Sequence, residues 1–101
     1  MKIEIKGTCL CVYDIQELTA VNSASFRDEV SSGLSTSTSL IEINLSQTRF
    51  MDSSGLGALF ALYRATIKRD GITLRLLNPL PEIQQLLELT QMQQLFEIVR
   101  R

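Results

Sequence analysis

The run FMDSSGLGALFALYR, residues 50–64, is the most informative part of this sequence, because it joins a polar corner to an apolar helical pattern. Asp52 and the two serines after it are residue types that cap helices. Gly55 and Gly57 then fall in what would be the first turn. Glycine costs about 1 kcal/mol relative to alanine inside a helix. Because glycine has no side chain, we interpret Gly55 and Gly57 as keeping the helix start open to close approach by a partner surface or a phosphate, at a cost in helix stability.

The chemistry of a helix start supports this interpretation and also allows a plainer one. The first N–H groups of a helix lack partners within it and, with the helix dipole, favour an anion. A phosphoserine here would add about −1.5 to −2 charges, so its strongest effect would fall on a partner pressed against the corner. The same residues also form an ordinary capping sequence, and the glycines could simply allow the helix to pack on a sheet. Both interpretations remain open at this stage.

Outward from this corner, the sequence predicts alternating strands and helices. Apolar residues of the central helix recur at spacings of three and four, which predicts a buried stripe; its members are Leu56, Leu59, Phe60, Tyr63 and Ile67. Asp70-Gly71 is expected to end that helix. Strands are expected over residues 2–6, 8–13, 40–45, 72–77 and 95–99, and further helices over about 23–32 and from Pro81 onward.

The connections define the fold class. Gly7 lies alone between the first two strand patterns, which predicts a tight turn and an antiparallel pair. Residues 14–20 are expected to be a connection, and residues 40–45 a central strand. Later strands alternate with helices, which indicates parallel strands with crossover helices. We therefore predict a single α/β domain over residues 1–101, with a mixed, mostly parallel sheet of four to five strands and flanking helices.

Composition excludes several classes of function. With a net charge of −1 the sequence shows no footprint for nucleic acid, and no apolar run is long enough to span a membrane. The N-terminus is not a signal peptide, so a cytoplasmic protein is expected. The chain has no histidine and no nucleotide-binding or hydrolase motif. Cys9 and Cys11 would share one strand face, and we interpret them as packing residues; no metal and no cofactor is expected.

The run FMDSSGLGALFALYRATIKRDG, residues 50–71, resembles the signature of STAS domains, specifically bacterial anti-sigma factor antagonists. The likeness continues through ELTAVNSASFRDEV at residues 17–30 and LIEINLSQTRFMD at residues 40–52. It also covers GITLRLLNPLPEIQQLLELTQMQQLFEI at residues 71–98, so it extends over nearly the whole chain. The resemblance implies a regulatory binding module without catalysis of its own.

In that family the unphosphorylated antagonist binds an anti-sigma factor that is also a serine kinase, and the sigma factor is released. The kinase then phosphorylates the serine after the Asp, and a separate serine phosphatase restores the active form. The resemblance places the phosphoacceptor at Ser53, with Ser54 as the less favoured neighbour. It places partner contacts at Thr19, Asp52, Ser53, Ser54, Gly55, Leu56 and Gly57. ATP and its divalent cation would belong to the kinase, and a monomer or weak dimer is expected.

Two departures from the family pattern affect these expectations. Many antagonists carry an acidic residue where this chain has Thr19, which bears on partner choice or phosphorylation rate. Gln91-Met92 replaces a frequent Gly-Leu and should alter only a helix end. The alternative function is a STAS-type regulatory subunit of a lipid-trafficking ABC transporter, which docks an ATPase subunit without phosphorylation. An enzyme is disfavoured, because Ser53 has no histidine or nearby lysine to activate it.

Overall fold

The main sheet has five strands in the order β1-β2-β4-β6-β7 in the computed structural model, which describes residues 1–69 and 71–101. The strands are β1 (Lys2–Lys6), β2 (Cys9–Tyr13), β4 (Leu40–Asn44), β6 (Thr73–Leu77) and β7 (Glu97–Val99). Only the β1–β2 pair is antiparallel, and Gly7 makes its turn at a φ of +61°. The predicted α/β class and mostly parallel mixed sheet are therefore confirmed, with β4 at the centre.

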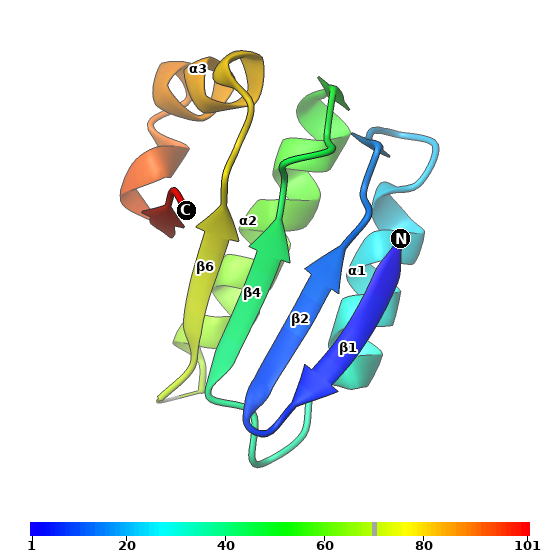
Figure 1. The fold of residues 1–101 in the computed structure, drawn as a ribbon, viewed down its shortest axis with the longest axis vertical. Coiled ribbons are helices and arrows are strands. Elements are labelled where there is room, and N and C mark those ends of the chain that lie inside the picture. The colour runs from blue at the N-terminus through cyan, green and yellow to red at the C-terminus, as the bar shows by residue number, and fades with distance from the viewer. Residues whose placement is uncertain (70) are drawn as a thin grey trace.

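The helices α1 (Ser23–Gly33) and α2 (Ser53–Ile67) cover one face of this sheet (Figure 1). Helix α3 (Pro81–Leu89) lies beyond the carboxyl end of β6, and a 3₁₀ turn at Met92–Gln94 leads into β7. Alternate strand residues face the helices and form the core with them. This core includes Leu10, Val12, Ile41, Ile43, Leu76, Phe26, Val30, Leu59 and Leu62. None of the helices in the described part of the chain is long and apolar enough to cross a membrane.

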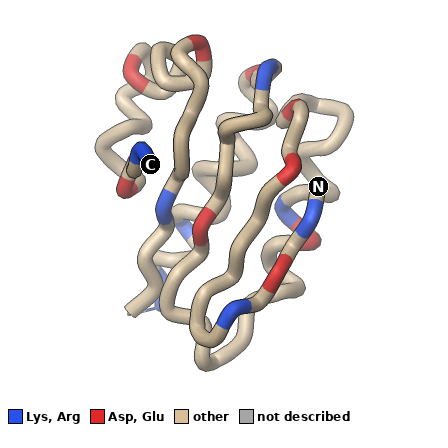
Figure 2. The backbone as a smooth tube through the Cα atoms, viewed as in Figure 1, with Lys and Arg blue, Asp and Glu red and all other residues tan. Residues whose placement is uncertain are grey.

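The opposite face of the sheet carries no helix among the described residues (Figure 1). The strand register places Glu4, Cys11, Glu42, Arg75 and Glu97 in one row across all five strands. Charges of both signs are interspersed along the backbone (Figure 2). The described part of this face therefore carries acidic and basic side chains together, without the single-sign patch that binds nucleic acid.

A second sheet, of two short strands, lies where the sequence predicted only a connection. Strand β3 (Glu17–Leu18) pairs in parallel with β5 (Phe50–Met51). Two residues are too few to show the alternation by which a strand is recognised in sequence. Their pairing depends on β2 and β4, whose ends bring the two segments together (Figure 1). The expectation that residues 14–20 are a plain connection was therefore wrong.

The buried face of α2 also differs from the predicted stripe. Leu59 is buried as expected, but Phe60 and Ile67 are 41% and 60% exposed. The buried residues of the helix are Gly55, Ala58, Leu59, Leu62 and Thr66. The small residues Gly55 and Ala58 let the helix backbone come close to its neighbours, and Leu59 and Leu62 supply the large buried side chains. Leu56 and Tyr63 of the predicted stripe are partly buried against the core. The expected helix end at Asp70 lies outside the described residues.

Candidate functional site at the start of α2

Asp52 is the N-cap of α2 and ties the helix to a distant loop. Its backbone is extended, with φ −113° and ψ −171°. One carboxylate oxygen, Oδ1, accepts a hydrogen bond from the Gly55 N–H at 3.0 Å, and Oδ2 accepts one from the Ala20 N–H at 3.0 Å. These two backbone donors, Ala20 foremost, lower the pKa of the carboxyl below its ordinary value. Asp52 is thus held ionised and fixed in direction at the corner.

The loop before α1 is ordered by its own hydrogen bonds. The Thr19 N–H donates to Asn22 Oδ1 at 2.9 Å, and Asn22 Nδ2 donates to the Glu17 carbonyl at 2.7 Å. The Ser23 N–H donates to the Thr19 carbonyl at 2.8 Å. Asn22 occupies the N-cap position of α1, yet its side chain serves this loop instead of the helix. The loop that carries Thr19 is therefore a fixed neighbour of Asp52, joined to it through Ala20.

Hydrogen bonds between the segment after β2 and the segment after β4 hold the start of α2 in place. The Asp52 N–H donates to the Leu18 carbonyl at 3.4 Å, beside the β3–β5 pairing. The fully buried Thr48 donates its hydroxyl to the Ile15 carbonyl at 2.6 Å. These bonds link residues more than thirty positions apart, so the site exists only in the folded chain.

The two candidate serines differ in exposure. Ser53 is the first residue of α2 and is exposed, and its hydroxyl has no hydrogen-bond partner among residues 1–69 and 71–101. Ser54 is half-buried. It borders a hollow of about 270 Å³ between α1 and α2 that Arg27 and Gly57 also line. The active site of a modifying enzyme can therefore reach the hydroxyl of Ser53 more easily than the hydroxyl of Ser54.

The two glycines are present for different physical reasons. Gly55 is buried, and a Cβ there would overlap the Leu18 carbonyl oxygen and lie 2.8 Å from its carbon. Gly57 is exposed, and a Cβ there would meet nothing within 4 Å. The packing explanation, which the sequence left open, therefore accounts for Gly55. It does not account for Gly57, whose open surface is available to a partner.

Exposed apolar side chains and a second hollow surround the corner. Phe50 on β5 is 66% exposed, and Val21 in the loop before α1 is 86% exposed. A hollow of about 390 Å³ beside the corner is lined by residues that include Thr19, Phe50, Asp52 and Leu86. Sequence reasoning did not single out Phe50 or Val21, because an apolar residue in a short segment gives no indication of its exposure. Phe50 lines this hollow, and an exposed apolar side chain beside a hollow is a feature of protein-binding surfaces.

The sheet, the helices and this capped corner together match a known class of small domain. The STAS domain family model matches residues 1–101, and the chain belongs to that family. No curated protein sequence matches the chain closely.

Three solved structures show the same fold as this chain. One is a protein described as a candidate anti-sigma factor antagonist from Thermotoga maritima; it has 21% identity and a TM-score of 0.83, covering 99% of this chain and 85% of that one. The anti-sigma factor antagonist SpoIIAA in its unphosphorylated form has 20% identity and a TM-score of 0.71, covering 97% and 86%. Phosphorylated SpoIIAA, a Bacillus cell fate determinant, has 20% identity and a TM-score of 0.72, covering 99% and 89%. At these identities the likeness establishes the fold of anti-sigma factor antagonists.

Proposed function

We propose that this protein is an anti-sigma factor antagonist whose binding to an anti-sigma factor with serine kinase activity is switched by phosphorylation of Ser53. The observation that carries the proposal is the state of Ser53: an exposed hydroxyl, without a hydrogen-bond partner in the described part of the chain, at the first position of a helix whose cap is already occupied by Asp52. A serine phosphatase would reverse the switch. The chain itself acts as a binding module, and ATP is used by the kinase.

The physical basis of the switch is a charge that the fold tolerates and a partner does not. A phosphate on Ser53 would add about −1.5 to −2 charges at the positive end of the α2 dipole, where an anion is favourable. Asp52 already engages its own donors and keeps the helix start intact without Ser53. A partner covering Phe50, Val21 and Gly57 would enclose the same phosphate, and burying an unpaired charge costs several kcal/mol.

Substitutions at Ser53 test the proposal directly. With its cognate serine kinase and Mg-ATP, the parent chain should gain one phosphate at Ser53, located by mass mapping of peptides. Ser53→Ala should gain none. Ser53→Asp should keep the fold, as judged by circular dichroism, and bind the kinase at least about tenfold more weakly, which corresponds to about 1.4 kcal/mol.

A matched control separates the position of the charge from its mere presence. Ser37→Asp makes the same change at another exposed serine. Ser37 precedes β4 and Ser53 follows it, so the control places the charge at the opposite end of that strand. This control should bind the kinase as the parent does. If Ser53→Asp also binds as tightly as the parent, the switch is refuted. If the chain instead binds an ABC transporter ATPase tightly and Ser53→Asp does not change that affinity, the alternative function of a transporter subunit is indicated.

A further inference from the structure

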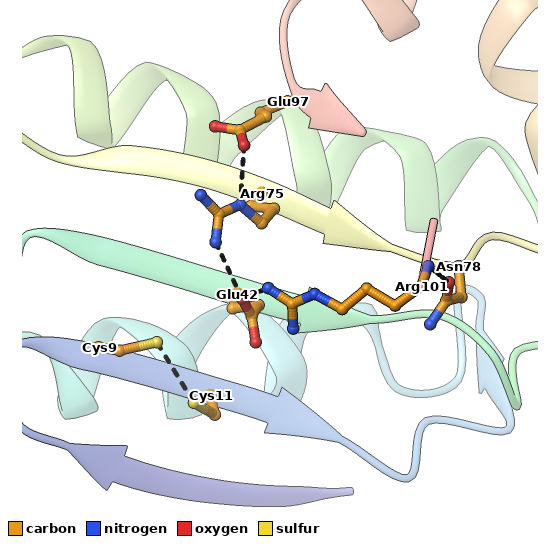
Figure 3. Close-up of polar contacts among 7 residues, drawn as sticks. All are labelled: Cys9, Cys11, Glu42, Arg75, Asn78, Glu97 and Arg101. Carbon is orange, nitrogen blue, oxygen red and sulfur yellow. Dashed lines mark hydrogen bonds and ion pairs between the residues drawn. The ribbon is translucent and has the colours of Figure 1, made fainter. Parts of the chain in front are cut away.

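Three side chains of metal-ligating types lie together on the face of the main sheet that the helices leave open. Cys9 and Cys11 are on β2, and Glu42 is on the neighbouring strand β4. The two Sγ atoms are 3.3 Å apart, and one ligand atom from each of the three residues lies within 4.8 Å of the others. Figure 3 shows the two thiols adjacent on β2, with Glu42 on the strand beside them. Their strand neighbours Leu10, Val12 and Ile43 point into the core beneath the helices, so this cluster is on the opposite face of the sheet from α2.

The strand register creates the cluster. Residues two apart on a strand point to the same face, which places both thiols on the open side. Cys11 is paired with Glu42 across the parallel β2–β4 ladder. The two cysteines by themselves offered too few ligands for a metal site, and the third lies 31 positions beyond Cys11 along the chain. Pairing of β2 with β4 supplies the missing carboxylate.

Glu42 is held in the manner of a ligating carboxylate. Its side chain is 15% exposed, and its Oε2 accepts hydrogen bonds from Arg75 Nη1 at 3.2 Å and from Arg101 Nη2 at 3.3 Å. Arg75 is itself fixed by Glu97, whose Oε1 accepts from Arg75 Nε at 3.0 Å (Figure 3). Both arginines use the same oxygen, so within the described residues Oε1 of Glu42 has no hydrogen bond. Outer groups that orient a carboxylate in this way are a regular part of metal sites.

We propose that Cys9, Cys11 and Glu42 bind a thiophilic divalent cation, for which Zn²⁺ is the best-fitting ion. Zinc prefers a tetrahedral set of sulfur, nitrogen and oxygen ligands, with Zn–S distances of about 2.3 Å and Zn–O distances of about 2.0–2.2 Å. Ligand atoms in such a set are roughly 3.5–3.8 Å apart. Side-chain rotations that move these atoms by about 1 Å therefore produce the required geometry. Two sulfurs and one oxygen leave the fourth position for water.

A bound metal ion takes cysteine as thiolate, so binding would release the thiol protons of Cys9 and Cys11 to solvent. Arg75 and Arg101 keep the carboxylate oriented toward the cluster.

Metal titration of the reduced, metal-free full-length chain tests the proposal. Zn²⁺ affinity is measured by competition with a chromophoric chelator, and Co²⁺ is used as a probe whose ultraviolet absorption reports thiolate ligation. The parent should bind one ion per chain. Cys9→Ser and Cys11→Ser should each weaken binding by about 100-fold or more, and Glu42→Gln by about 10-fold or more, since even outer groups contribute 10–100-fold.

Glu29→Gln is the matched control, because it makes the same change at an exposed glutamate of α1, on the opposite face of the sheet from the thiols. Its Zn²⁺ affinity should stay within about twofold of the parent, since distant sites act nearly independently. The proposal is overturned if the parent binds Zn²⁺ no better than the Cys9→Ser/Cys11→Ser double variant, if Co²⁺ shows no thiolate absorption, or if only half an ion binds per chain. Glu42→Gln keeps the test decisive should a serine variant fail to fold.

Discussion

Alanine at the two glycines of α2 is expected to have opposite effects on the free energy of unfolding. At Gly57 a methyl group meets nothing within 4 Å, and the residue is exposed. Gly57→Ala therefore gains helix propensity alone, about 1 kcal/mol. For a domain of this size the melting temperature should rise by about 4–8 °C.

At Gly55 the same methyl group would overlap the Leu18 carbonyl oxygen, which is backbone and has no rotamer to move it aside. Overpacking costs typically 1–3 kcal/mol, and a clash with backbone belongs at the upper end, about 3 kcal/mol. The propensity gain of about 1 kcal/mol offsets part of this. Gly55→Ala should therefore destabilise the protein by about 2 kcal/mol and lower the melting temperature by about 8–16 °C.

Urea denaturation followed by far-ultraviolet circular dichroism measures both variants, and an unchanged m-value shows that the two-state comparison holds. The expected difference between Gly57→Ala and Gly55→Ala is about 3 kcal/mol. Equal stability of the two variants would refute the close approach of α2 to β3. Gly57→Ala also separates folding from binding: if Gly57 lies under a partner, this variant should gain stability while losing affinity for the kinase.

The remaining predictions use the same denaturation assay. The folded state lowers the pKa of Asp52, so its contribution to the free energy of unfolding is complete above the ordinary Asp pKa of about 3.9 and is lost as pH falls through the folded-state pKa. The difference in unfolding free energy between the parent and Asp52→Asn should therefore shrink progressively below about pH 4. A difference that does not change with pH would contradict this. Leu62→Ala should lower the free energy of unfolding by about 2–5 kcal/mol, because Leu62 is buried. Ile67→Ala should lower it by less than about 1 kcal/mol, because Ile67 is 60% exposed. The reverse order would favour the buried stripe that the sequence predicted. Thr48→Val should cost about 1–3 kcal/mol by leaving the buried Ile15 carbonyl without its donor, and no loss would mean that another group satisfies it.

The strands of the main sheet and the start of α2 were predictable because their patterns are local. Alternation over residues 2–6 and the apolar run over residues 40–45 each lie within a few positions, and the capping residue Asp52 acts on a donor three positions away. Interactions of such short range are recorded in neighbouring letters of the sequence. The same locality explains why Pro81 correctly marked the first position of α3.

Tertiary structure alone decided what lies at the functional corner and beneath it. The β3–β5 pairing and the hydrogen bond from the Ala20 N–H to Asp52 join segments about thirty residues apart. The exposure of Ser53 depends on how these segments pack. The approach of the Leu18 carbonyl separates the role of Gly55 from that of Gly57, although the two residues look alike in sequence. Strand register, likewise, brought Glu42 beside the two cysteines. The physical reason is common to all of these: contact between distant segments depends on how helices and strands pack, and local periodicity does not encode that packing.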